Sequence, residues 1–228
     1  MPSGLVTRLG AEALGALVLV YFGTAAIVSP GTDVLGFSIA FAVALAVAIW
    51  IFGATSGGHF NPAVTLAVAI RGGIGWAEAG MYAVAQIVGA FVASLLVWLT
   101  YGTAGPAAGL GATRVSIRTD PIVALIVEAI ATFVFVLVIL TLTTGDRAGN
   151  RTTALGIGLT LGLANISLAT VTGASLNFAR TFGPELALSF ADGGDPKWNH
   201  IWVYLLGPAI GAAAAAYAFG PLTRRAAR

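Results

Sequence analysis

Two asparagines at matching points of two similar segments are the residues whose type and spacing could do chemistry. Asn61 stands in SGGHFNPAVTLAV and Asn177 in TGASLNFARTFGP, each after a Gly-rich turn and before a short apolar run. An asparagine beside such a turn ordinarily caps a helix. Two copies, each at the start of a run too short to cross a bilayer, favour a pair that faces a common pore.

A constant offset relates the two segments and shows that the chain is a duplicated unit. Glu12 lies 49 residues before Asn61, and Glu128 lies 49 residues before Asn177. Self-similarity at a fixed offset, here 116 residues, is the signature of an internal repeat. The two asparagines therefore occupy equivalent places in the two copies.

The elements that position these residues must lie in a membrane. Hydrophobic residues make up 58% of the 228 residues and charged residues only 9%, which is the composition of an integral membrane protein. Six apolar runs are long enough to span a bilayer, and breaks with Gly, Pro or charged residues separate them. The runs are about Leu9–Val28, Leu35–Phe52, Ala79–Thr100, Ile122–Thr143, Ala154–Val171 and Ile201–Phe219.

Two further apolar runs, Asn61–Ile70 and Asn177–Phe190, have about half the length of a span. The first makes a rod of roughly 15 Å, against a hydrocarbon core of ~30 Å. Each repeat then consists of two spans, a half-span and a third span, and this odd number of full spans turns the second copy upside down. The two half-helices enter from opposite faces, and their positive N-termini meet at the midplane.

We therefore predict an all-α integral membrane protein with six transmembrane helices and two re-entrant half-helices in an inverted 3+3 repeat. It forms a single channel domain over residues 1–228, with repeat 1 at about 5–105 and repeat 2 at about 119–222. Backbone that leaves the helix at membrane depth is tolerated only where protein buries it or where it lines a wet cavity. The Gly-rich turns therefore imply a pore or a binding site.

Three charged residues stand in apolar surroundings. Arg180 follows Asn177 by three residues, and a cation in a half-helix is expensive unless it faces water or backbone carbonyls, which indicates a pore-lining side chain. Glu12 and Glu128 are the carboxylates inside the full spans. A proton relay is one role for such a pair, and a structural role is the other.

Basic residues in the short loops indicate that both termini are cytoplasmic. In that orientation seven basic residues lie inside and three outside, with Arg180 left aside, and basic residues favour the inner side. The inner set is Arg8, Arg71, Arg147, Arg151, Arg224, Arg225 and Arg228, and the outer set is Arg114, Arg118 and Lys197.

Composition excludes several kinds of function. The absence of cysteine excludes disulfides, thiol chemistry and Cys-ligated metals. The net charge is only +2 and the basic residues are dispersed, so we expect no nucleic-acid partner. With two histidines and no recognisable nucleophile–base spacing, a membrane enzyme is poorly supported, and we expect no metal and no cofactor.

The two segments resemble the paired Asn-Pro-Ala boxes of the aquaporin, or major intrinsic protein, family, and the likeness is to its water-channel branch and to archaeal-type aquaporins. The match covers nearly the whole chain, including both span glutamates and the Gly207-Pro208 pair of the last span. The residues that match the boxes are Asn61, Pro62 and Ala63 in the first and Asn177, Phe178 and Ala179 in the second.

The resemblance implies where the pore narrows. The two boxes would form the midplane, and Phe178, which stands where the family has Pro, adds bulk there and affects the pore width. The family's second constriction falls on four positions that are counted from the two asparagines, and these are Phe41, Asn165, Ala174 and Arg180. Asn165 departs from the His of strict water channels, and this shorter side chain should leave a wider opening.

The resemblance also implies structural roles and an assembly. Glu12 and Glu128 would be braces that hold the pore-loop backbones by accepting N–H bonds, in place of a proton relay. His59 would line the inner vestibule. The family implies a homotetramer in the lipid bilayer of the cell membrane, with one pore in each subunit.

The expected function is a passive channel for water, with slow passage of small neutral solutes such as glycerol and with exclusion of ions and protons. Thr181 follows Arg180 where glycerol channels typically carry Asp, which favours water. One alternative is a glycerol or small-solute facilitator. Another is a coupled secondary transporter, which also uses inverted repeats and broken helices. It would need ionisable groups to bind a coupling ion, and the spans offer none besides Glu12 and Glu128.

Overall fold

The computed structural model of the chain describes residues 4–144 and 152–223, and the regular elements in this part are helices. Six of the described helices are long and apolar enough to cross a membrane. They are α1 (Leu5–Val28), α2 (Val34–Ser56), α4 (Trp76–Tyr101), α6 (Pro121–Thr143), α7 (Thr153–Thr172) and α9 (Ile201–Thr223). The predicted all-α class with six spans is confirmed.

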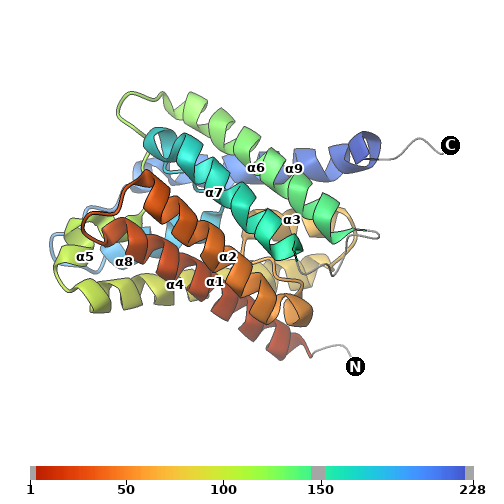
Figure 1. Cartoon of the computed structure of the whole chain (residues 1–228), viewed down its shortest axis with the longest axis horizontal. Coiled ribbons are helices and arrows are strands. Elements are labelled where there is room, and N and C mark those ends of the chain that lie inside the picture. Colours follow the sequence, from red (N-terminus) through yellow and green to blue (C-terminus); the bar gives the residue numbers. More distant parts are fainter. Residues whose placement is uncertain (1–3, 145–151, 224–228) are drawn as a thin grey trace.

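The two half-helices are α3 (Pro62–Ile70, 9 residues) and α8 (Phe178–Leu188, 11 residues). At the helical rise they are rods of about 14 and 16 Å, so neither crosses a bilayer alone. Figure 1 shows α1 beginning and α9 ending at one end of the molecule, which we call the inner end. The same view places α3 in the inner half and α8 in the outer half.

The helices pack as two halves that exchange their half-helices. α1 lies against α2 and α4, and in the second half α6 lies against α7 and α9 in the same way. α8, however, packs mainly on α4 of the first half, and α3 mainly on α9 of the second. Each half-helix therefore ties the two repeats together, which is the inverted arrangement that the duplicated sequence predicts.

Two glycines bring equivalent helices into close contact. A Cβ atom on Gly89 of α4 would lie 2.0 Å from the carbonyl oxygen of Ala13 in α1, and one on Gly211 of α9 would lie 2.1 Å from that of Ala129 in α6. Without a hydrophobic driving force between helices in lipid, such close backbone contact supplies much of their attraction. The two crossings show the repeat at the level of packing.

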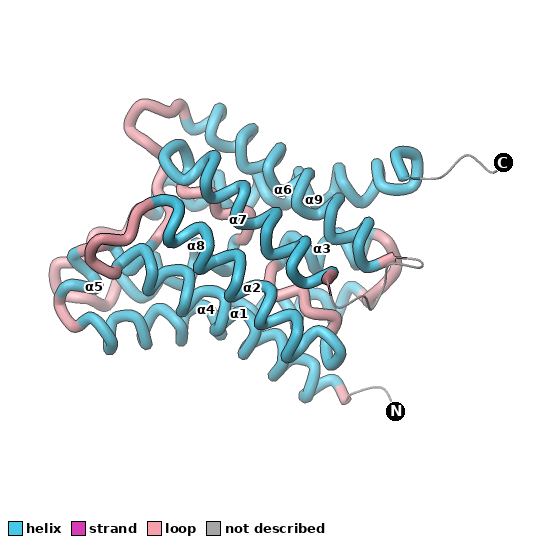
Figure 2. The backbone as a smooth tube through the Cα atoms, viewed as in Figure 1, coloured by secondary structure: helices cyan, strands magenta, loops and turns pink. Residues whose placement is uncertain are grey.

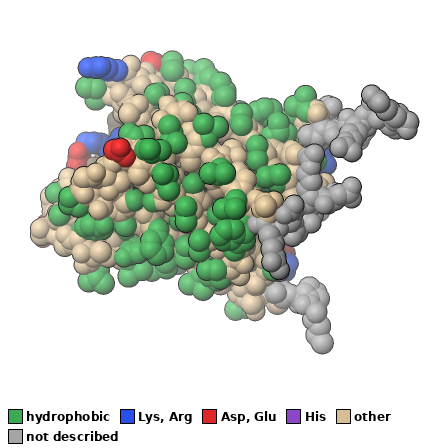
Figure 3. Space-filling view, in the orientation of Figure 1, with side chains coloured by type: hydrophobic (Ala, Val, Ile, Leu, Met, Phe, Trp, Pro, Cys, Tyr) green, Lys and Arg blue, Asp and Glu red, His purple; other side chains and the backbone are tan. Residues whose placement is uncertain are grey.

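The side of the molecule is apolar. Figure 3 shows hydrophobic side chains over this surface, while the charged side chains in view lie toward the two ends. Large examples are Phe22, Ile130 and Leu159, which are 56%, 60% and 67% exposed. A soluble protein would bury such residues, whereas a bilayer is a good solvent for them.

Two helices begin earlier than the apolar runs indicate. α1 begins at Leu5 and α4 at Trp76, because each continues through one charged residue. Arg8 and Glu78 lie in these added turns, and their side chains pair at 2.9 Å. The ion pair joins α1 and α4 at the inner end of the molecule.

Other features were not predicted or are not described. Figure 2 shows most of the loops at the two ends of the bundle. The described outer loops contain three short helical turns. These are α5 (Ala104–Ala107), η1 (Gly109–Gly111) and η3 (Trp198–His200). Of the basic residues used to predict orientation, five lie outside the described residues, namely Arg147, Arg151, Arg224, Arg225 and Arg228.

Candidate functional site

The two asparagines cap the half-helices and hold the two pore loops together. Asn61 Oδ1 accepts from the Ala63 amide at 2.8 Å, and Asn177 Oδ1 accepts from the Ala179 amide at 3.0 Å. Their side-chain nitrogens cross between the repeats: Asn61 Nδ2 donates to the Leu176 carbonyl at 2.8 Å.

Asn177 Nδ2 makes the reciprocal bond to the Phe60 carbonyl at 2.9 Å. An amide nitrogen carries two N–H groups, and the second one in Asn61 and in Asn177 has no acceptor among the described residues. Both side chains line a narrow lumen. Each therefore offers one N–H donor to a molecule at the midplane.

The loops that precede the asparagines have strained backbones. Phe60, Ala174 and Leu176 have φ angles of 49°, 47° and 54°, in the left-handed region that residues with a Cβ seldom adopt. Such conformations persist where the surroundings dictate them. Buried acceptors for the loop N–H groups are therefore required, and the span glutamates supply them.

Glu12 receives four hydrogen bonds. Its Oε1 accepts from the Ser56 hydroxyl at 2.6 Å and from the His59 amide at 3.0 Å. Its Oε2 accepts from the Phe60 amide and from Gln86 Nε2, both at 2.7 Å. A carboxylate with every lone-pair direction occupied by a structural donor is poorly placed for relaying protons.

Glu128 binds the second loop in the same way with one donor fewer. Its Oε1 accepts from the Thr172 hydroxyl at 2.7 Å and from the Ser175 amide at 2.9 Å. Its Oε2 accepts from the Leu176 amide at 2.8 Å. Glu12 and Glu128 are both buried, and both make the contacts expected of a brace.

Two tyrosines complete the support of the loops, and the sequence analysis missed them. The Tyr82 hydroxyl donates to the Ser56 carbonyl at 2.9 Å, and the Tyr204 hydroxyl donates to the Thr172 carbonyl at 2.6 Å. Their separation in the sequence is 122 residues, not 116, because the second copy has a longer connection before its last helix. A search that allowed insertions would have paired them.

The lumen between the two pore loops is small. It has a volume of about 20 Å³, which is room for about one water molecule. The structure brings together here all four residues of the predicted second constriction, with both asparagines and His59. The lining consists of Leu19, Phe41, Leu45, His59, Asn61, Phe135, Leu161, Asn165, Ala174, Ser175, Asn177 and Arg180.

Arg180 supplies the positive charge of this narrow region. Its Nη1 donates to the Gly111 carbonyl at 2.8 Å, and its Cζ lies 4.8 Å from the centre of the Phe41 ring. The side chain is buried, and among the described residues it has no carboxylate in contact. A backbone carbonyl and an aromatic face therefore hold Arg180 without neutralising its charge.

Asn165 presents an acceptor to the same space. Its Nδ2 donates to the Leu161 carbonyl at 3.0 Å, one turn earlier in α7. A carbonyl oxygen attracts the amide nitrogen and repels the amide oxygen, so Oδ1 points away from it. Oδ1 is buried without a partner among the described residues. The constriction thus combines the donors of Arg180, one acceptor and the apolar ring of Phe41.

Four residues of the two boxes do not line the lumen. Pro62 and Phe178 occupy the first turn of α3 and of α8, where Ala63 and Ala179 donate their amides to the caps. The Phe178 ring centre lies 5.4 Å from that of Phe182, one turn further along α8. The Phe178 ring therefore lies outside the lining of the narrow lumen. The expectation that its bulk affects the pore width is not supported.

The inner mouth is wider than the outer constriction. It is a cavity of about 330 Å³ whose lining includes Arg8, Val64 and Tyr82. His59 lines both this cavity and the narrow lumen, and its Nδ1 lies 3.1 Å from the Thr65 hydroxyl. The prediction that His59 borders the inner vestibule agrees with this position.

The comparisons with known proteins agree on one family. The model of the major intrinsic protein family matches residues 3–219. A glycerol uptake facilitator protein-like 6 of Lactiplantibacillus plantarum is 43% identical over 211 residues, which cover 91% of this chain and 94% of the relative. A probable aquaporin AqpM of Archaeoglobus fulgidus is 36% identical, with 98% of this chain and 100% of the relative covered.

A solved structure shows the same fold. The aquaglyceroporin from Plasmodium falciparum has a TM-score of 0.85 and covers 95% of this chain and 96% of its own, with 23% sequence identity. The six spans and two half-helices derived from the sequence are therefore the fold of a known channel.

Proposed function

The chain belongs to the major intrinsic protein family, and on that premise we propose that it is a passive channel that conducts water, lets small neutral solutes such as glycerol pass slowly, and excludes ions and protons. The family is one of channels and not of enzymes. The observation that carries the proposal is the lumen itself, in which two amides from opposite half-helices each present a free N–H beside a single buried cation.

Water at the midplane would meet two donors and the positive ends of two helices. Its oxygen accepts from Asn61 and Asn177, so its hydrogens point away toward the two mouths. A water held in this way cannot accept a proton from a neighbour while it donates to the next one. The same positive field repels cations, and Arg180 adds a full charge to it.

The outer constriction would set the ratio of water to larger solutes. A hydroxylated solute can accept from Arg180, donate to Asn165 Oδ1 and lay its C–H groups against Phe41, because the three groups line one lumen. The volume of about 20 Å³ favours water over glycerol. The alternative is a glycerol or small-solute facilitator, and the facilitator-like relative at 43% identity supports it.

We extend the proposal to the assembly and the orientation. An apolar groove of about 670 Å³ between α1 and α2, lined by Phe22, Val43 and Tyr101 among others, supports a homotetramer in which other subunits cover this face. The excess of arginines in the inner loops supports a plasma-membrane channel with both termini cytoplasmic.

Stopped-flow light scattering on proteoliposomes tests the function. We expect fast shrinkage in an impermeant osmolyte, slow re-swelling in glycerol, and rates that do not depend on an imposed Na⁺ or proton gradient. Glycerol entry as fast as water entry would favour the facilitator. Uptake that requires either ion gradient would overturn the channel and favour a coupled transporter.

A further inference from the structure

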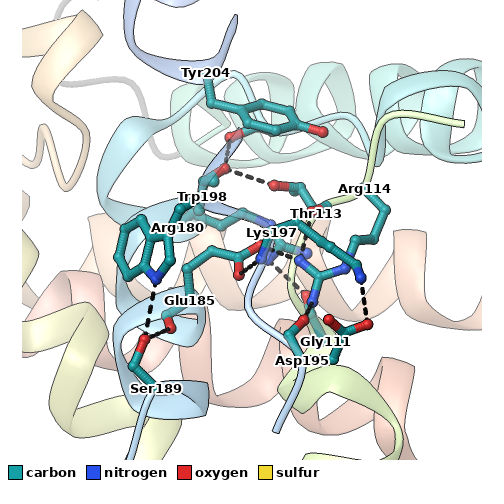
Figure 4. Close-up of polar contacts among 12 residues, drawn as sticks. Gly111, Thr113, Arg114, Arg180, Glu185, Ser189, Asp195, Lys197, Trp198 and Tyr204 are labelled. Carbon is teal, nitrogen blue, oxygen red and sulfur yellow. Dashed lines mark hydrogen bonds and ion pairs between the residues drawn. The ribbon is translucent and has the colours of Figure 1, made fainter. Parts of the chain in front are cut away.

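A partly buried ion pair lies outside the lumen, next to Arg180, which carries the positive charge of the lumen; the side chain of Arg114 is 33% exposed. Figure 4 shows Arg114, from the loop after η1, beside Glu185 of α8 and close to Arg180. The side chain of Glu185 is 2% exposed, and its Oε1 pairs with Arg114 Nη1. A buried carboxylate in a half-helix costs free energy unless it is paired. Glu185 therefore does not serve solubility, as a surface charge would, and another role must explain it.

Arg114 and Glu185 join three segments of the chain. Arg114 Nη2 donates to the Asp195 carbonyl at 3.1 Å, which reaches the connection between α8 and α9. Glu185 Oε2 accepts from the Lys197 amide in that connection at 2.7 Å. We call these four residues the outer clamp, because they fasten two loops to α8.

The loop that carries Arg114 also holds Arg180. Gly111 lies three residues before Arg114, and its carbonyl accepts from Arg180 Nη1 at 2.8 Å. The Thr113 hydroxyl lies 2.8 Å from that of Thr181, the residue after Arg180. The loop therefore touches α8 at Arg180, at Thr181 and at Glu185.

The backbone of this loop is not self-supporting. Leu110 has a φ of 47° and Gly111 a φ of 67°, and η1 is a single turn of three residues. A Cβ on Gly111 would lie 2.7 Å from Thr24 Cβ in α1, so the carbonyl is wedged between α1 and α8. An irregular, strained turn keeps one position only when contacts outside it fix that position.

We propose that the Arg114–Glu185 pair is a positioning device for Arg180: it fixes the loop whose Gly111 carbonyl holds the guanidinium at the constriction. Glu185 and Arg114 are positioning residues, since neither lines the lumen. The inference rests on the proposed channel function and adds selectivity-determining residues that lie outside the pore.

The exposed side-chain charges of Asp195 and Lys197 do not serve this role, because these two residues join the clamp through backbone groups. Asp195 and Lys197 pair through their side chains at the surface, and the hydrogen bond from Lys197 lowers the pKa of the Asp195 carboxyl. Arg118 is exposed and lies in the same loop as Arg114, and its backbone amide donates to the Ser116 hydroxyl. Arg118→Gln is therefore a matched control that removes the same charge from the same loop.

The test compares Glu185→Gln, Arg114→Gln and Arg118→Gln in proteoliposomes, with water permeability, glycerol permeability and proton leak measured per folded channel. We expect the glycerol-to-water ratio and the proton leak to rise on the order of fivefold in the first two variants and not in the control. If the clamp only stabilised the protein, the variants would contain fewer folded channels. The glycerol-to-water permeability ratio and the proton leak per folded channel would then stay unchanged. Wild-type ratios in folded Glu185→Gln and Arg114→Gln would overturn the inference.

A second background separates positioning from a direct effect of the lost charge. If Glu185 acts through Arg180, then Glu185→Gln should add no further leak to Arg180→Val, since coupled residues are not additive. Additive leaks would overturn the inference. Arg114→Lys, which keeps the charge and one donor, should restore most of the selectivity. Absence of water flux in the wild type would contradict the proposed function instead, so the two failures are distinguishable.

Discussion

The two pore loops of this protein share their support but not their chemistry. Each loop has a span glutamate that accepts its N–H groups, a tyrosine that donates to its first carbonyl, and an asparagine that caps the half-helix and bonds to the other loop. At the offset of 116, however, Arg180 corresponds to Val64 and Glu185 to Ala69. The repeat therefore builds one scaffold twice and places the selecting charge only on the outer copy.

The two loops also differ in what lies behind them. Gln86 of α4 donates to Glu12 and to the Thr65 hydroxyl, at 2.7 and 2.9 Å. Its counterpart in α9, at the spacing of the two tyrosines, is Pro208, which has no side-chain donor. In the outer copy the Thr181 hydroxyl instead meets Thr113, from a loop. A helix supports the inner pore loop, and a loop with the outer clamp supports the outer pore loop.

Removal of the braces should have the largest effect. Glu12→Gln and Glu128→Gln each replace an acceptor by an amide that turns a donor toward loop N–H groups. We expect a loss of about 3 kcal/mol or more, because each orphaned buried N–H costs about 1–3 kcal/mol. Thermal unfolding in detergent, followed by size-exclusion chromatography, measures it, with Glu78→Gln as control. Because Glu12 has four donors and Glu128 three, Glu12→Gln should cost more; the reverse order would show that Gln86 compensates for the lost brace.

Arg180→Val should have the next largest effect, since it gives the outer loop the residue that the inner loop has. Water flow should persist, while proton and cation leak should rise about 70-fold to 400-fold, because a full charge at membrane depth is worth about 2.5–3.5 kcal/mol and each 1.36 kcal/mol is a factor of ten in rate. A pH-sensitive dye inside vesicles under an imposed potential reports the leak. An unchanged leak would mean that the half-helix ends form the barrier alone.

Asn165→His should have a smaller effect, which concerns size and hydrogen bonding. The imidazole narrows the opening and replaces the free acceptor Oδ1. We expect glycerol permeability to fall roughly fivefold more than water permeability. Stopped-flow traces with the two solutes on one vesicle preparation give the ratio. Equal losses, or a wild type that already excludes glycerol, would show that Asn165 does not discriminate between them.

Phe178→Pro makes the second box match the first and should have the smallest effect. Its ring packs on Phe182 outside the lining of the lumen, so water and glycerol permeability should stay at wild-type values. Stability should change by about 1 kcal/mol or less, since the lost ring contact is offset by a proline suited to the first helical position. A clear change in the permeability ratio would place Phe178 at the lumen.

The sequence predicts the parts of this structure that repeat. The offset shared by the glutamates and asparagines, together with the half-length of two apolar runs, suffices for the inverted fold, because hydropathy and bilayer thickness leave few alternatives. The midplane amides follow from the same frame, whereas the four constriction positions come from the resemblance to the aquaporin family, which gives their distances from the two asparagines. Phe178 could be located, but the direction of its ring depends on packing against Phe182, which no local pattern encodes.

The parts that do not repeat could not be read in this way. Gly111 holds Arg180 through its backbone carbonyl. Because every residue type has a backbone carbonyl, the sequence does not show which residue makes this contact. Glu185 stands near the end of an apolar run, and its partner Arg114 lies 71 residues away in a loop. The two residues can be paired only once the position of the loop that carries Arg114 is known, and the repeat pattern does not give that position.

The most direct test of the account measures water flux and proton leak in the same wild-type proteoliposomes. Osmotic shrinkage should be much faster than in protein-free vesicles, while an internal pH dye under an imposed potential should show a proton leak no greater than theirs. Water flux equal to that of empty vesicles, or a proton leak that rises in step with the water flux, would contradict a pore in which two crossed amides and one uncompensated arginine separate water from charge.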